Sequence, residues 1–256
     1  VGTPADPYKP NNRFTNVAAF TQVAYSINHL DVNAGARFDR FTYHIDASEG
    51  LKAPEANANY NTLNPSVGAQ YQFLENFKAH TSFGTAFSVP DAFKVAGKYT
   101  VSGKSYVGNP DLDPEKSRTG DVGLGYSSAK TSLRFDVTYF QTLHDHKIVE
   151  EKMTSGEYTY VNANVSKMEG IELMSSFDLG QFLPEKPQLE AYVNFTWILK
   201  DDFTQLVGTE MLTREMQYVR KANGNFGLNY RHDRISMRLN SRYIGSRLER
   251  DLFSTL

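Results

Sequence analysis

Two lysines and two tyrosines in a polar, glycine-containing segment, residues 91–108, are the side chains best suited to binding a ligand. These are Lys98, Tyr99, Lys104 and Tyr106. A lysine ammonium attracts anionic groups, and a tyrosine ring stacks on aromatic ones and on cations. Together they would suit a ligand that is both anionic and aromatic. The alternative is that they are ordinary solvated residues of a surface loop.

A histidine pair, His144 and His146, flanks Asp145. At i and i+2 of a strand, both imidazoles would share a face and could bridge a metal ion. The pair lies near the end of a predicted strand, where solvated histidines are ordinary. The sequence therefore assigns no metal site here.

Catalytic constellations are missing from the sequence. The chain has no cysteine, which excludes disulfides, thiolate metal sites and a catalytic thiol. No G-x-S-x-G motif is present, and the glycines at 223–227 lack the strand-to-helix context of a phosphate-binding loop. We expect no catalytic residue and no cofactor.

The elements that must position these side chains are strands. The clearest example is residues 30–39, where apolar and polar residues alternate with a period of two. Leu30, Val32, Ala34, Ala36 and Phe38 oppose Asp31, Asn33, Gly35, Arg37 and Asp39. A helix would scatter these charges around its circumference. The same alternation recurs at 17–27, 67–73, 77–85, 121–126, 133–139, 171–178, 189–199, 226–230 and 235–243, which predicts about ten strands.

The connections between these strands alternate in length. Short turns are expected at 28–29, 75–76, 127–130, 180–187 and 231–234, and mostly longer loops at 45–62, 88–117, 150–157 and 201–214. Outer-membrane barrels have short periplasmic turns and long extracellular loops. A soluble two-sheet sandwich also permits alternation, but it gives no reason for this asymmetry.

Composition is compatible with a membrane barrel. No run approaches the ~20 apolar residues of a membrane helix, but a membrane strand needs only ~9–11 residues, of which every second one is apolar. The polar face includes Asp31, Arg37, Gln70, Lys78, His80, Arg134, Asp136, Glu172, Glu190, Arg238 and Arg242. Such charges cannot fill a dry core, but they can line a wet or plugged lumen. The net charge of −2 gives no support to nucleic-acid binding.

Short motifs recur in the order of a known family. Phe87-Ser88-Val89-Pro90 is followed by a second box that contains Asn109, Pro110, Leu112, Pro114 and Glu115. The two resemble the paired boxes in the C-terminal barrel half of TonB-dependent outer-membrane receptors, although Ser88 stands where the family usually has arginine. Segments 160–173, 223–230 and 242–247 resemble the strands that follow. Each pattern is weak alone, but their shared order is specific.

The resemblance implies an all-β fold: an antiparallel transmembrane β-barrel fragment of about ten up-and-down strands, part of a barrel of about 22 strands around a plug. Residues 1–256 would then be a partial β-barrel domain, with the plug domain and the terminal strands absent. The implied location is the Gram-negative outer membrane. The implied partners are outer-membrane lipid and the TonB complex, the latter through the missing N-terminal part.

The implied function is TonB-dependent uptake of a ferric siderophore or similar iron chelate, bound by extracellular loops and the upper lumen. Lys98, Tyr99, Lys104 and Tyr106 are the expected ligand-binding residues. Heme and cobalamin receptors of the same family are alternatives. Residues 91–108 contain no histidine, which disfavours heme, although tyrosine can ligate heme iron. A plug-free porin-like barrel and an outer-membrane enzyme are further alternatives.

Overall fold

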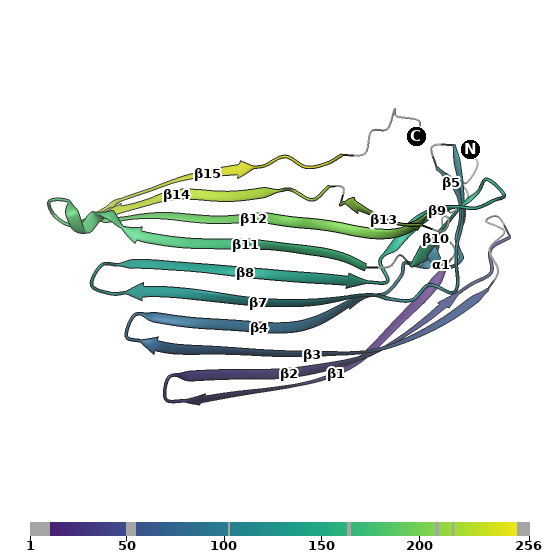
Figure 1. Cartoon of the computed structure of the whole chain (residues 1–256), viewed down its shortest axis with the longest axis horizontal. Helices are drawn as coiled ribbons and strands as arrows, with labels where there is room; N and C mark the ends of the chain where they lie inside the picture. Colours follow the sequence, from purple (N-terminus) through teal and green to yellow (C-terminus); the bar gives the residue numbers. More distant parts are fainter. Residues whose placement is uncertain are drawn as a thin grey trace.

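The chain forms one large antiparallel sheet. The computed structural model describes residues 11–49, 55–101, 103–162, 165–207, 210–216 and 218–249. Ten strands follow one another in sequence order across the sheet, and β13 adds to the side of β12 (Figure 1). They are β1 (Asn12–Ile27), β2 (Leu30–Ile45), β3 (Ala56–Leu74), β4 (Phe77–Ser88), β7 (Glu115–Ser128), β8 (Leu133–Asp145), β11 (Val165–Asp178), β12 (Gln188–Val207), β13 (Glu210–Glu215), β14 (Ala222–His232) and β15 (Ile235–Ile244). The expected all-β, up-and-down fold is confirmed.

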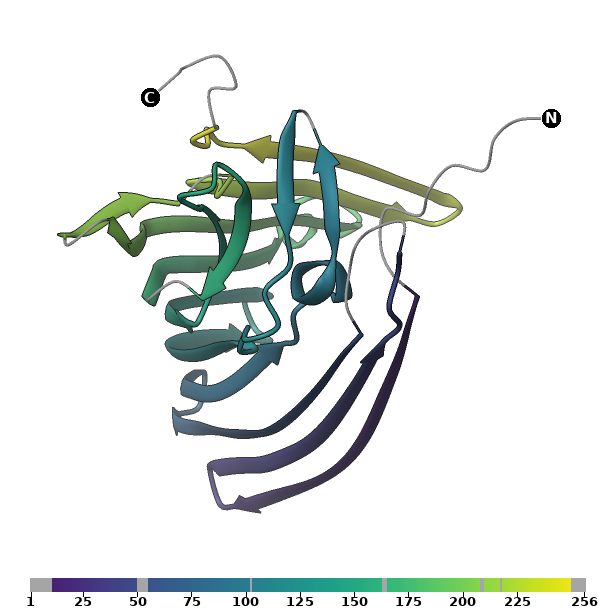
Figure 2. The same ribbon diagram turned by 90° about the vertical axis from the view of Figure 1, so that its right-hand side faces the viewer.

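The sheet is curved and open. Strands β1 and β15 stand at the two ends of the hydrogen-bonded order, so the ladder does not close. Viewed along the strands, β1–β3 and β14–β15 form the two arms of a C (Figure 2). Part of a larger barrel wall has this shape, because the wall of a barrel bends continuously in one direction.

Short and long connections lie at opposite ends of the strands (Figure 1). At the turn end, three of the tight turns contain a non-glycine residue in the left-handed region: Asn28 (φ 52°), Ser132 (φ 49°) and Asp233 (φ 46°). Asparagine and aspartate adopt this conformation more readily than other residues. A longer turn carries the 3₁₀ helix η1 (Leu179–Phe182). The expected asymmetry between short turns and long loops is therefore present.

One face of the sheet is apolar and exposed. Register pairs Ala34 with Val23 on β1 and with Val67 on β3, so these side chains share this face. Val23 keeps 64% of its surface exposed and Leu239 keeps 66%. In the described residues, no second layer covers this face, which contradicts the sandwich alternative. An apolar surface of this extent is stable when lipid covers it.

The opposite, concave face is polar and is linked laterally. Arg37 Nε lies 2.8 Å from Asp39 Oδ2, and His80 Nε2 lies 3.1 Å from Asp136 Oδ2. Gly123 makes room for this second pair, because a Cβ there would lie 2.3 Å from His80 Cε1. These charges thus find partners on their own strand or across the sheet, which lowers the cost of removing them from bulk water.

The apolar face ends in a polar collar near the loop end. Lys167 Nζ lies 2.8 Å from Glu169 Oε2, and Tyr139 Oη donates a hydrogen bond to the same oxygen over 3.0 Å. Below the collar, the apolar residues of β2 extend from Leu30 to Phe38. Those nine residues rise roughly 30 Å, or roughly 23 Å across a bilayer at ~40° tilt, close to the ~25 Å apolar band of membrane barrels.

A second, smaller sheet covers the concave side at the loop end (Figure 2). It contains β5 (Lys98–Val101), β6 (Lys104–Val107), β9 (Ile148–Lys152) and β10 (Tyr158–Asn162), in the order β5-β6-β10-β9. The short helix α1 (Ala92–Ala96) precedes it, and Val95 packs against Ile45 of β2, which is fully buried. We call α1 and these four strands the cap. The cap replaces most of the loop expected at 88–117 and part of that at 150–157.

Other strands are longer than the alternation predicted. β3 begins at Ala56, and β12 pairs with β13 across much of the region expected to be a loop at 201–214. In the first residues of β3, Asn57, Asn59 and Asn61 lie on the face that is apolar nearer the turn end. These extensions rise above the apolar band, so the apolar period that marks a membrane strand is lost there. In the described ranges, no helix has the length and apolarity needed to cross a bilayer.

The two faces should respond differently to a new charge. In the membrane-embedded protein, Ala34→Arg places a charge in the middle of the apolar face and should cost ~2–4 kcal/mol of stability. Asn33→Arg, one residue away on the polar face, should cost much less. A urea refolding titration of both variants measures the difference. Equal costs, or the reverse order, would contradict the assignment of faces.

The open edges make the isolated chain a poor folding unit. Among the described residues, one side of β1 and one side of β15 have no ladder partner. Hydrocarbon cannot satisfy the unpaired N–H and C=O groups of such edges, and in water they are sites of aggregation. We expect the 256-residue chain expressed alone to aggregate. Size-exclusion chromatography in detergent and bilayer conductance test this. A monodisperse, heat-resistant, conducting monomer would show that the chain closes on itself.

Candidate functional site

The four residues expected to bind ligand all lie in the cap. Tyr99 and Tyr106 face each other across the β5–β6 hairpin, with parallel rings whose centroids lie 4.9 Å apart. Tyr106 also stacks on Tyr160 of β10, at 5.9 Å, and is only 5% exposed. Tyr160 and Leu112 are buried in the same cluster. The tyrosines are therefore packed side chains and not solvated loop residues.

The hydroxyl groups of this cluster are paired with one another and with a carboxylate. The hydroxyls of Tyr99 and Tyr160 share a hydrogen bond, and Tyr106 Oη donates to Glu150 Oε1 over 3.1 Å. Burial and the hydrogen bond with Tyr99 raise the pKa of Tyr160 well above its ordinary value, with Glu150 adding to the effect. Tyr160 is thus a neutral phenol at physiological pH, and its use as a phenolate ligand for a metal is disfavoured.

The cap lysines lie against glutamates and aromatic rings. Lys98 Nζ is 3.6 Å from Glu157 Oε1, and Lys104 Nζ is 3.7 Å from Glu150 Oε2. Lys104 also lies over the ring of Tyr158, 4.4 Å from its centroid. Both lysines keep a substantial exposed surface, and exposed ion pairs of this kind contribute little to stability. Each lysine can therefore exchange its glutamate for another anion at small cost.

The two motif boxes anchor the cap to the large sheet. Phe87 packs edge-on against Phe41 of β2, with centroids 5.1 Å apart, and Pro90 and Pro114 are buried. The carbonyl of Leu112 accepts a hydrogen bond from Tyr60 Oη of β3, over 3.2 Å. These motif residues therefore hold the chain on either side of the cap against β2 and β3.

Asparagines complete this anchor. Asn109 Nδ2 donates to the Tyr160 carbonyl over 2.9 Å, while its Oδ1 accepts from the Asp111 N–H, and exposed Pro110 lies in that turn. Asn162, at the end of β10, makes three bonds. Its Nδ2 donates to the carbonyls of Asp113 and His146, and its Oδ1 accepts from the Asp113 N–H. A single side chain therefore ties the end of β10 to the segment that enters β7 and to the segment that leaves β8.

Two further contacts hold the entry and exit of the cap. Glu115 Oε1 accepts from the Ile148 N–H over 2.8 Å, which ties the start of β7 to β9. At Gly108 the chain passes so close to α1 that a Cβ would lie 2.6 Å from the backbone nitrogen of Ala96. Only glycine permits this approach.

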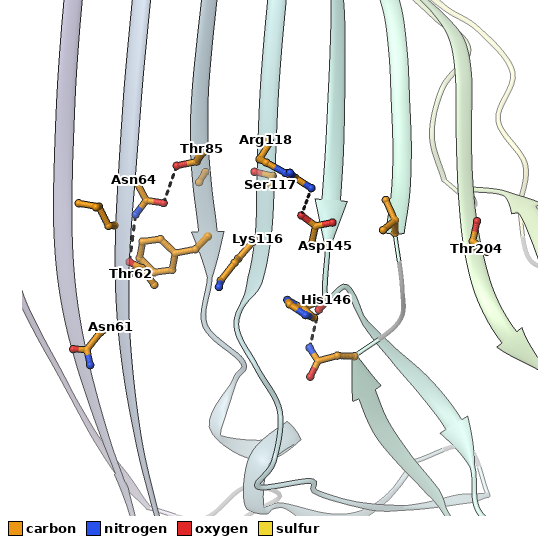
Figure 3. Close-up of a pocket in the computed structure, with 15 residues that line it drawn as sticks. Asn61, Thr62, Asn64, Thr85, Lys116, Ser117, Arg118, Asp145, His146 and Thr204 are labelled. Carbon is orange, nitrogen blue, oxygen red and sulfur yellow. Dashed lines mark hydrogen bonds and ion pairs between the residues drawn. The ribbon is translucent and has the colours of Figure 1, made fainter. Parts of the chain in front are cut away.

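A cavity of about 870 Å³ lies at the loop end, beside the point where β3 and β4 stop pairing at Ser66–Gly84. Figure 3 shows its polar lining: Asn64 bonds to Thr85 on the neighbouring strand, and Arg118 reaches Asp145, with Nη2 and Oδ2 2.8 Å apart. Lys116 and Phe87, which are paired across β4 and β7, line the same wall. The cavity is mixed in charge and open, and it can admit a polar ligand.

The histidine pair does not form a shared face. β8 ends at Asp145, and His146 takes a left-handed backbone (φ 57°), so the strand geometry assumed for i and i+2 does not extend to it. His146 lines the cavity and its carbonyl accepts from Asn162. Within the described ranges, no group of three or more His, Cys, Asp or Glu is arranged to hold a metal ion.

Comparison with known proteins identifies the family. A family model described as TonB dependent receptor-like, β-barrel, matches residues 1–255. The chain belongs to this family. It is thus part of a barrel of the Gram-negative outer membrane and is not an enzyme.

Solved structures share the fold of this TonB-dependent receptor barrel. They include a Serratia marcescens hemophore receptor, HasR, in complex with its hemophore HasA and heme (16% identity, TM-score 0.73), which covers 93% of this chain and 45% of that one. The copper transporter OprC has 16% identity, a TM-score of 0.70, and coverage of 96% and 38%. The FrpB iron transporter of Neisseria meningitidis has 18% identity, a TM-score of 0.64, and coverage of 92% and 33%. The chain spans between a third and a half of these structures.

The sequence of this receptor barrel did not predict the residues that contact Lys98, Tyr99, Lys104 and Tyr106. Phe93, Tyr158, Tyr160, Glu150 and Glu157 complete the cluster, and they come from α1 and from the 148–162 hairpin. Among the described residues, one ladder pair joins the two hairpins, Tyr106 with Tyr158, and it is parallel. The clustering of tyrosines at 99, 106, 158 and 160 was the available signal.

The anchoring role of Asn162 can be measured. In the complete receptor, Asn162→Ala removes three hydrogen bonds and should lower the free energy of cap opening by about 1–3 kcal/mol. Hydrogen exchange of amides at 98–107 and 148–161 should accelerate, while that of β7 and β8 stays slow. Asn57→Ala, which removes one bond to His44, is the matched control. Unchanged cap exchange in Asn162→Ala would refute the anchor.

Proposed function

We propose that the complete protein is a TonB-dependent receptor that takes up a ferric siderophore or similar anionic iron chelate. The cap and the upper part of the barrel bind the chelate on the extracellular side. TonB then acts on the plug of the complete receptor to release the ligand inward. Family membership and the position of the cap over the concave face support this proposal.

One observation carries the choice of ligand. The lysines at 98 and 104 are held beside a stacked tyrosine cluster by exposed and weak ion pairs. An aromatic, anionic chelate can replace the glutamates and lie against the edges of the rings. Because Tyr160 is held neutral and the hydroxyls of Tyr99 and Tyr106 are already hydrogen-bonded, the proposed contact is to the organic part of the chelate, and the iron keeps its own ligands.

Heme remains the second candidate class, and two features bear on it. Residues 91–108 contain no histidine, and neutral Tyr160 is a poor axial ligand. Similarity to the hemophore receptor extends to the fold alone at 16% identity. A chelate in which the protein supplies no ligand to iron fits the cap better.

The test separates charge from packing. Replacing the two tyrosines would remove buried side chains and open the cap, so Lys98→Gln with Lys104→Gln is the informative variant of the complete receptor. It should bind a ferric catecholate about tenfold more weakly, because two charge contacts of moderate strength are lost. Equilibrium titration by fluorescence quenching measures the change.

Lys130→Gln with Lys186→Gln, at the turn end, removes the same charge and should bind normally. Heme and cobalamin are titrated in parallel with all three proteins. Equal affinity of the cap variant and the parent for the catecholate would exclude the lysines. Uptake of heme or cobalamin without binding of iron chelates would overturn the substrate class.

A further inference from the structure

A groove crosses the apolar face of the sheet near its loop end. Its lining is Phe195 and Trp197 of β12, Ala222 and Phe226 of β14, and Tyr243 of β15, and it encloses about 480 Å³. These three strands are neighbours in the order of the sheet (Figure 1), so the groove needs no strand beyond those described. This face lies against the membrane, so the occupant must come from there.

Register explains why a groove exists at this place. Directly paired positions on β12, β14 and β15 are occupied by Phe195, Gly224 and Tyr243. The next pair on this face of β12 and β14, toward the loop end, is Trp197 and Ala222. The Ala222 carbonyl accepts the Gly245 N–H over 2.8 Å, which adds Gly245 to this pair. Small residues thus form a floor between aromatic walls. Phe195 and Phe226 lean over Gly224, where a Cβ would lie 2.7 Å from Phe195 Cδ2.

The upper end of the groove is basic. Arg220 and Arg247 form an isolated antiparallel bridge just beyond the loop ends of β14 and β15, two residues above Ala222 and Gly245, which places them on the same face. Arg220 Nη1 donates to the Gly245 carbonyl over 3.2 Å, so its guanidinium lies at the end of the floor. Arg247 lies 5.6 Å from the Tyr218 ring and pairs with Glu249, with Nε and Oε1 2.7 Å apart. These three charges leave a net positive end.

We propose that this groove binds one acyl chain of a phosphorylated glycolipid of the outer leaflet, with a lipid phosphate between Arg220 and Arg247. The loop end faces outward, so the apolar face just below it contacts the outer leaflet. An apolar channel that ends in two guanidinium groups matches a lipid in which the acyl chain joins a phosphate-bearing head. The site lies on the face opposite the cap and is independent of the iron-chelate proposal.

Bulk lipid would also cover this face, but at the groove one molecule is retained in a defined place. A shaped groove fixes the chain, and guanidinium binds phosphate through two parallel hydrogen bonds. Elsewhere in the collar, Lys167 and Lys200 lie within 4 Å of Glu169 and Asp202 and are neutralised by them. At the groove, Arg247 pairs with Glu249, whereas Arg220 makes no ion pair with a carboxylate among the described residues.

The complete receptor, extracted in mild detergent with its native lipid, is examined by native mass spectrometry after exchange into fresh detergent. The parent should retain one phosphorylated glycolipid per monomer. Ala222→Leu fills the floor, and Arg220→Gln with Arg247→Gln removes the phosphate partners. Each should reduce the retained fraction at least fivefold. Ala191→Leu, on the same face outside the groove, and Arg234→Gln, at the turn end, should retain the lipid as the parent does.

Added lipid identifies the contact. Delipidated receptor should rebind the phosphorylated glycolipid, and enzymatic removal of its phosphates should weaken rebinding to the level of the double arginine variant. Inorganic phosphate should not compete. Retention that is equal in all variants, retention of unphosphorylated lipid in its place, or a second protein copy seated on this face would overturn the proposal. Heat-modifiability on gels confirms that every variant keeps the barrel intact.

Discussion

The backbone must satisfy its own hydrogen bonds where water is absent, and the rest of the molecule follows from this requirement. In hydrocarbon an unpaired N–H or C=O costs several kcal/mol, so a spanning sheet needs an unbroken ladder. The pairing of β2 with both β1 and β3 over its whole length shows such a ladder. Once the ladder is complete, a single layer suffices, because lipid replaces the second layer of a soluble fold.

A single layer changes where burial occurs. Within the described residues, the two clusters of buried apolar side chains lie at the loop end: Ile45 with α1, and Tyr106 with Leu112 and Tyr160. Above the membrane, water returns and apolar residues must again cover one another. The cap is therefore a small soluble structure built on a membrane scaffold, and its tyrosines serve its packing as well as any ligand. Binding chemistry in this region must come from side chains that packing does not need.

The strands and faces could be predicted from sequence because both depend on local alternation. Val32 and Asn33 differ in character, and the pleat places them on opposite faces without reference to any other segment. The cap could not be predicted in this way. Asn162 bonds to Asp113, which is far away in the sequence, and Glu150 pairs with Lys104 through a hairpin that shows no period. Even the family boxes indicated only where a loop should be. Their contacts with Tyr60 and Phe41 depend on how the sheet curves.

The parallel contact of β6 with β10 at Tyr106 and Tyr158 implies an order of assembly. The two hairpins of the cap are separated in the chain by β7 and β8, which pair with each other from Lys116 with Asp145 to Ser128 with Leu133. Bringing distant segments together costs loop-closure entropy until intervening structure shortens the effective separation. Insertion of β7 and β8 into the bilayer supplies that shortening, since it fixes both hairpins at the same rim. The cap should therefore close last, after the wall beneath it has formed.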